Sequence, residues 1–135
     1  MPAEFVLEHP CGLRIERTLL ESEASAIDGV TVRDMKTGYV WYDLPEAEIA
    51  GSPILVALCF FERSLNRVTF SVSDEVYGTS WSDWSDSKER ARSEATRKWL
   101  DSLGYPVGKY RWGSVYAEFD PRGGGGGGGV VFTRP

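Results

Sequence analysis

The chain has 135 residues, the usual size of one domain, and its 41% hydrophobic and 26% charged residues are typical of a globular protein. The formal net charge of −5 argues against nucleic acid as a partner, because phosphate binding needs a clustered positive surface. The longest apolar run has eight residues, too few for a membrane span. We therefore expect a single domain over residues 1–135 that binds neither nucleic acid nor membrane.

The N-terminal half predicts short elements. A strand is expected at residues 4–8 and a short helix at residues 19–26, where Thr18 and Glu21 have the spacing of a capping box. Residues 30–33 and 39–44 are rich in strand formers and flank a turn, which predicts a hairpin. Residues 45–53 are expected to form a polar, acidic connection. The N-terminal residues lack the pattern of a signal peptide, so we expect a cytoplasmic protein.

Two strands are expected in the middle of the chain. Residues 54–61 are apolar at every position, which is typical of a strand that is covered on both faces and lies near the centre of its sheet. Residues 67–73 alternate, with Val68, Phe70 and Val72 on one side. The pattern predicts that these two strands pair antiparallel.

The clearest helix is expected at about residues 83–103. Its apolar residues recur at spacings of seven and four and form one stripe: Trp84, Ala91, Ala95, Trp99 and Leu103. Gly104 followed by Pro106 is a strong signal for the end of a helix. We expect this helix to pack on one face of the sheet.

The C-terminal segment contains seven consecutive glycines at residues 123–129. They lie between an alternating strand at residues 112–119 and an apolar one at residues 130–132. A phosphate-binding loop needs a following helix, and a Walker loop also needs a lysine; neither is present. We interpret the run as a flexible glycine loop of a hairpin. The predicted fold is α+β, with an antiparallel sheet of about six strands, one long helix on one face and a short N-terminal helix.

Charge is unevenly distributed along the chain. Residues 1–67 carry eleven acids and six bases, whereas residues 68–135 carry nine of each. An acidic surface of this kind can steer a basic partner, although it can also serve only solubility. The candidates for partner binding are Glu21, Glu23, Asp43, Glu46 and Glu48.

Two tryptophans support an alternative function. Trp84 and Trp99 belong to the predicted helix stripe, whereas Trp81 and Trp112 lie outside it. If exposed, Trp81 and Trp112 are candidates for stacking on a ligand, in a small-molecule or glycan-binding domain. Packing across the ends of the helix is the structural explanation of both residues.

No residue pattern predicts an active site or a metal site. His9 is the only histidine, and with Cys11 and Cys59 it lacks a fourth soft ligand for zinc. Paired carboxylates such as Asp83 and Asp86 are the only basis for a hydrolase, and acids are common at helix N-termini for structural reasons. We expect no enzyme, no catalytic residue, no metal and no cofactor.

Three motifs in residues 50–135 carry a resemblance. They are a tryptophan-rich helix start (SWSDWS, residues 80–85), a WGSV strand (residues 112–115) and DPRGG (residues 120–124). This half of the chain resembles a group of small, mostly uncharacterised bacterial proteins, many of them suspected immunity proteins that bind and neutralise a toxin made by the same cell. The resemblance implies a non-catalytic protein that occludes a basic toxin, and it assigns no catalytic residue.

Overall fold

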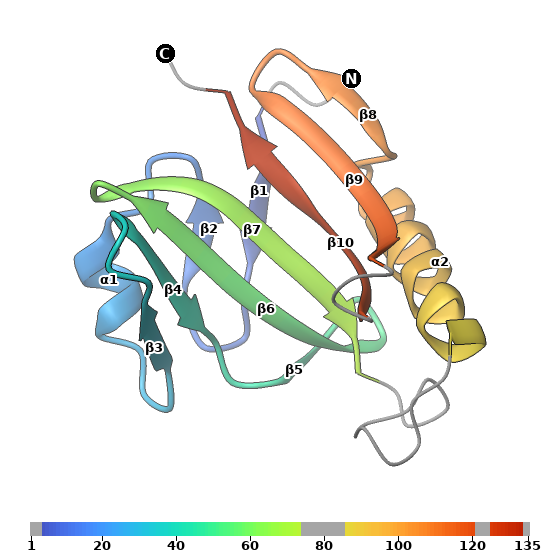
Figure 1. The fold of residues 1–135 in the computed structure, drawn as a ribbon, viewed down its shortest axis with the longest axis horizontal. Helices are drawn as coiled ribbons and strands as arrows, with labels where there is room; N and C mark the ends of the chain where they lie inside the picture. Colours follow the sequence, from blue (N-terminus) through green and yellow to red (C-terminus); the bar gives the residue numbers. More distant parts are fainter. Residues whose placement is uncertain (1–3, 74–85, 121–124, 134–135) are drawn as a thin grey trace.

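The computed structural model describes residues 4–73, 86–120 and 125–133 (Figure 1). It has an α+β fold with a mostly antiparallel sheet, as predicted. The two helices of this described part are α1 (Glu21–Ser25) and α2 (Asp86–Ser102). The strands are β1 (Val6–Glu8), β2 (Arg14–Glu16), β3 (Thr31–Asp34), β4 (Tyr39–Asp43), β5 (Ala47–Ile49), β6 (Ser52–Phe61), β7 (Ser64–Val72), β8 (Gly108–Tyr110), β9 (Gly113–Asp120) and β10 (Gly125–Phe132).

The main sheet has the strand order β3-β4-β6-β7-β10-β9-β8, with β5 paired to part of β6, while β1 and β2 form a separate hairpin. The described residues contain ten strands instead of about six. The strands that the sequence did not predict, β2, β5 and β8, have three residues each, too few for alternation to be recognised. β6 lies inside the sheet, as expected. The long helix is confirmed from Asp86, and residues 83–85 lie outside the described part of the chain.

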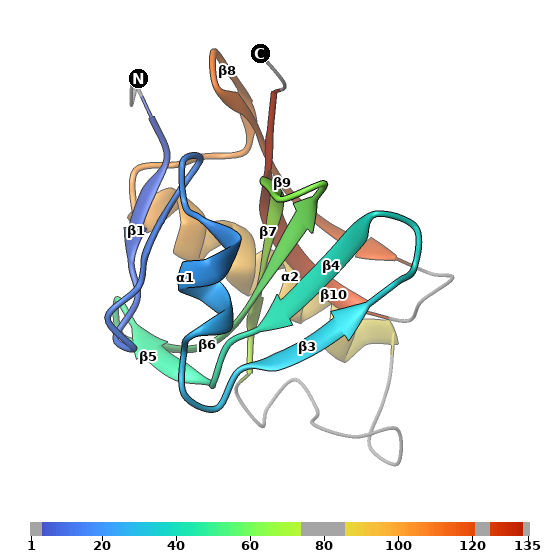
Figure 2. The same ribbon diagram turned by 90° about the vertical axis from the view of Figure 1, so that its left-hand side faces the viewer.

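Both helices and the β1–β2 hairpin lie on one face of the sheet (Figures 1 and 2). The strand register aligns Tyr42, Leu58, Val68 and Val130 in one row across this covered face, and all four are buried. Phe5, just before β1, is also fully buried and contributes to the same core. No described element covers the opposite face, which we call the open face.

β6 is not covered on both sides as predicted. Val56, Leu58 and Phe60 are buried, but Leu55 points to the open face and is 45% exposed. A continuous apolar run therefore overestimated the burial of Leu55, because all the described packing elements lie on one side of the sheet.

The glycine run forms a strand inside the sheet, so its interpretation as a loop is wrong from Gly125 onward; residues 123 and 124 lie outside the described part. β10 pairs with β9 along Gly125–Phe132 and with β7 from Gly128 to Val131. A side chain on Gly126 would overlap the Glu89 carbonyl oxygen of α2, and a Cβ on Gly128 would lie 3.2 Å from Thr96 Cγ2. The glycines thus allow α2 to pack directly on the strand backbone.

The buried face of α2 also differs from the predicted apolar stripe. Ala91 is exposed, and Trp84 lies outside the described residues. The buried residues of the helix are Glu89, Ser93, Thr96, Trp99 and Leu100. The polar groups among them have partners, since Glu89 Oε1 accepts the N–H of Gly126 at 3.1 Å and Trp99 Nε1 donates to the Ile49 carbonyl at 2.8 Å. Short side chains such as Ser93 and Thr96 fit where the helix lies against the glycine backbone, and buried polar groups need hydrogen-bond partners.

The β6–β7 hairpin has an unusual turn, from which a first prediction follows. Glu62 and Arg63 have φ values of 48° and 73°, in the left-handed region that costs non-glycine residues about 1 kcal/mol each. Asn-Gly is the preferred pair in such turns. We expect Glu62→Asn combined with Arg63→Gly to raise the free energy of unfolding by about 1 kcal/mol in urea denaturation. Unchanged or lower stability would show that the turn is not strained.

Candidate functional site

The acidic candidates on α1 both make contacts within the chain. Glu21 accepts a hydrogen bond from the Tyr42 hydroxyl at 2.7 Å. Burial and then this bond to a carboxylate raise the pKa of Tyr42 to about 12. Glu23 is exposed and accepts the N–H of Leu20 at 3.1 Å, which caps the helix. These two carboxylates therefore also hold the N-terminal segment in place.

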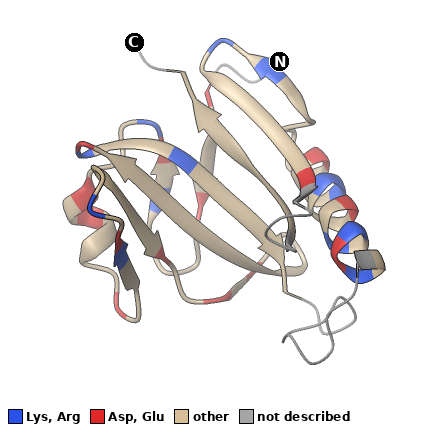
Figure 3. Ribbon diagram, in the orientation of Figure 1, with Lys and Arg blue, Asp and Glu red and all other residues tan. Residues whose placement is uncertain are grey.

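The other acidic candidates lie on different elements. Asp43 accepts two hydrogen bonds of 2.7 Å from the Arg33 guanidinium, on the open face. Glu46 accepts a hydrogen bond from the Ser73 hydroxyl, and Glu48, on β5, is exposed. Figure 3 shows acidic residues on α1 and around β5 at separate places along the ribbon. The structure places the five candidates on different elements and does not gather them into one cluster.

The sheet edge at β3 is the most accessible part of this acidic half. β3 is the last strand of the sheet, and no strand of the described residues pairs with its outer edge (Figure 2). All four of its residues are exposed. Large apolar side chains are exposed in the β3–β4 hairpin: Val32 (52%), Met35 (50%) and Tyr39 (38%). We call β3 with these three side chains the β3 edge.

The outward-facing backbone groups of β3 follow from the ladder pattern. The Met35 N–H donates to the Tyr39 carbonyl at 3.0 Å, across the β3–β4 pair. Hydrogen bonding alternates along an antiparallel strand, so Thr31 and Arg33 also face β4. The N–H and C=O groups of Val32 and Asp34 consequently point away from the sheet. They can pair with an added strand.

The open face carries two stacked arginines. The Arg33 guanidinium lies 5.3 Å from the Trp41 ring centre, and that of Arg67 lies 5.6 Å from the Tyr116 ring centre. Between them on β6 lies Cys59, which is buried and whose thiol has its pKa raised by burial. These side chains cover the middle of the face. A groove of about 390 Å³ lies beside them, with Asp43, Leu55 and Glu118 among its walls.

The ligand-stacking alternative is not supported at Trp112. The residue is 1% exposed, and its ring stacks on Tyr110 with centres 4.8 Å apart. It belongs to the hydrophobic core, so the interpretation of Trp112 as an exposed platform is wrong. Trp81, the other candidate, lies outside the described residues.

The potential metal ligands are not gathered into a site. Cys11 is exposed and Cys59 buried, and both are free thiols. His9 is buried, and burial lowers the pKa of its imidazole. Within residues 4–73, 86–120 and 125–133, no group of three or more His, Cys, Asp or Glu residues is placed to hold a metal ion.

Sequence reasoning located the acidic half of the chain but missed the β3 edge. Exposure of Val32 depends on which strand ends the sheet, and residues 30–33 look like any half-buried strand. Neither described helix is long and apolar enough to cross a membrane. The chain matches no protein-family model, no curated protein and no solved structure.

Proposed function

We propose that the chain is a non-catalytic protein-binding module whose β3 edge takes up an extended, basic segment of a partner protein. The observation that carries the proposal is an exposed edge strand, with outward backbone groups, in the acidic half of the chain. Addition of a strand to a sheet edge is a common mode of peptide recognition, in which the main chain supplies affinity and alternate side chains supply specificity.

The β3 edge lacks three common protections against strand addition. Exposed edges are commonly blocked by lysine, proline or a β-bulge, and β3 (Thr-Val-Arg-Asp) contains no lysine or proline and pairs with β4 without a register shift. Its one cation, Arg33, is held by Asp43 through two hydrogen bonds. Exposed Val32 and Met35 add apolar area to the edge. Such an edge favours association over solubility alone.

The acidic charge around the β3 edge indicates a basic partner. Residues 20–48 contain seven acids against two bases, Arg33 and Lys36. This imbalance attracts a basic segment and raises its association rate at low salt. It also disfavours pairing of two β3 edges from two copies, because their acidic surroundings would repel. A basic toxin that is neutralised by occlusion, as the resemblance implies, has the required chemistry.

A substitution at the edge tests the proposal. Proline at position 32 removes an outward N–H and leaves the bonds to β4 in place, so we expect the fold to be kept. The probe is an acetylated, amidated peptide of three Lys-Val repeats. We expect it to bind the unsubstituted protein and to bind Val32→Pro at least about tenfold more weakly, as measured by NMR titration. Val32→Ala, which keeps the N–H, is the control and should lose less affinity.

Three results would contradict this function. They are equal affinity of the Val32→Pro and unsubstituted proteins, peptide-induced shifts centred away from β3, and binding that is insensitive to salt. Sedimentation measurements without peptide test whether a second copy of the chain binds the β3 edge instead. A dimer that Val32→Pro abolishes would replace the proposed partner with self-association.

A further inference from the structure

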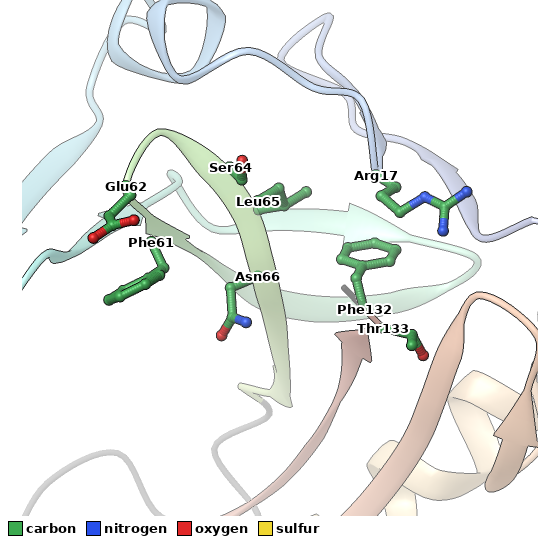
Figure 4. Close-up of a pocket in the computed structure, with 8 residues that line it drawn as sticks. All are labelled: Arg17, Phe61, Glu62, Ser64, Leu65, Asn66, Phe132 and Thr133. Carbon is green, nitrogen blue, oxygen red and sulfur yellow. The ribbon is translucent and has the colours of Figure 1, made fainter. Parts of the chain in front are cut away.

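The ladder between β7 and β10 stops before either strand ends. Its last pair is Arg67 with Val131, although β7 begins at Ser64 and β10 continues to Phe132. A pocket of about 550 Å³ lies at this place, and both strands contribute to its lining (Figure 4). We call it the β7–β10 pocket.

A β-bulge shapes this end of β7. Phe60 pairs with Leu65 and Cys59 with Arg67, so Asn66 is an extra residue that has no partner in the register with β6. Bulges turn side chains away from regular alternation and are frequent beside binding sites. The bulge adds the Asn66 amide, a donor and an acceptor, to the lining of the pocket.

The pocket combines an apolar floor with a cation at its rim. Leu65 and Phe132, both 4% exposed, are its buried apolar residues. Arg17 and Glu62 also line it, and Figure 4 shows them at opposite ends of the labelled group, with Arg17 near Phe132. Its polar lining is thus positive at one end and negative at the other.

Arg17 is available to a ligand. Among the described residues it forms an ion pair of 3.2 Å with Glu4, and the two side chains are 41% and 52% exposed. Exposed pairs of this kind are weak and screened by salt, so a ligand carboxylate in a less hydrated pocket can replace Glu4. Arginine also suits a carboxylate geometrically, because its planar guanidinium offers two parallel donors.

We propose that the β7–β10 pocket binds a small organic carboxylate with an apolar body. The carboxylate pairs with Arg17, and the apolar body lies against Leu65 and Phe132. Glu62 at the far end repels the carboxylate and so fixes the orientation of the ligand, while Asn66 hydrogen-bonds polar groups on the body. The pocket is formed by different residues from the β3 edge, and this site does not depend on the proposed protein partner.

The test uses two probes of equal shape, 3-phenylpropionate and its neutral amide, 3-phenylpropionamide. In NMR titrations we expect the carboxylate to shift the amide signals of Leu65, Asn66 and Phe132 in a saturable way. The neutral amide should bind roughly tenfold more weakly, since it lacks the charge-assisted bonds to Arg17. Arg17→Gln should weaken carboxylate binding by a similar factor and bring the two probes to equal affinity.

Two further variants keep the test decisive. Glu4→Gln frees Arg17 and should tighten carboxylate binding, whereas Arg14→Gln, which removes an exposed arginine that pairs with Glu8 and Glu16 away from the pocket, should leave it unchanged. Equal affinity of the two probes for the unsubstituted protein, absence of saturable shifts, or loss of affinity in Arg14→Gln equal to that in Arg17→Gln would overturn the proposal. If Arg17→Gln fails to fold, the Glu4→Gln variant decides: unchanged carboxylate affinity in it would also overturn the proposal.

Discussion

Replacing Gly126 with alanine is expected to lower the free energy of unfolding by more than about 3 kcal/mol. The added methyl group would overlap the Glu89 carbonyl oxygen, which belongs to the helix backbone and cannot move as a side chain does. α2 would have to lift from β10, which would break the bond between Glu89 Oε1 and the Gly126 N–H and separate Thr96 and Leu100 from Gly128. Urea denaturation followed by circular dichroism measures the loss.

Gly12→Ala is the matched control. Gly12 lies in the β1–β2 turn with a φ of +97°, and a Cβ there would have no atom within 4 Å. Only the left-handed backbone resists the substitution, at about 1–2 kcal/mol. If Gly126→Ala lowers the free energy of unfolding no more than Gly12→Ala does, the glycines do not pack under α2. Residues 125–129 would then be a loop that tolerates side chains.

The second large effect is expected at Trp112. The substitution Trp112→Ala should cost about 3–5 kcal/mol, because it leaves a large cavity in a cluster of aromatic rings. The ring is 1% exposed and has Tyr110, Phe5 and Phe132 around it, with ring centres 4.8, 5.9 and 6.1 Å away. Thermal or urea denaturation monitored by fluorescence of the remaining tryptophans gives the cost.

Trp112→Phe separates packing from ligand stacking. Phenylalanine keeps most of the buried area, so we expect a smaller loss of stability than with alanine. A Trp112→Ala protein that remains as stable as the unsubstituted chain but loses a ligand would instead restore the exposed-platform interpretation.

The elements with strong local signals were predictable. The alternation of Val68, Phe70 and Val72 marked β7, and the signal at Gly104 marked the end of α2 within two residues. Both patterns reflect forces within a short segment, namely burial of one face and the conformational freedom of glycine at a helix end. The α+β class follows from such segments.

The glycine strand was not predictable from composition, because residues without side chains show no hydrophobic pattern. A signal did exist in its partner, where Glu89, Ser93 and Thr96 recur at spacings of four and three and form a stripe of mostly small polar residues on one helix face. Burial of such a polar stripe is favourable only where it packs against a strand backbone that carries no side chains. The sequence stripe Ala91–Ala95–Trp99 obscured it.

Of the candidate site, only the acidic charge could be predicted from the sequence. The excess of acids in the N-terminal half is visible in the sequence, but the β3 edge exists because β3 ends the sheet, and the β7–β10 pocket exists because a ladder stops early. Strand order and bulges arise from long-range pairing, which local patterns do not encode.

Amide hydrogen exchange of the free protein, read residue by residue by NMR, tests the central claim, a sheet with the glycine strand inside and the β3 edge open. We predict strong protection for the amides of Gly127, Gly128 and Gly129, which pair with β9 or β7. The amides of Val32 and Asp34 should exchange rapidly, since they face away from β4. Unprotected glycine amides, or protected amides at Val32 and Asp34, would contradict the account.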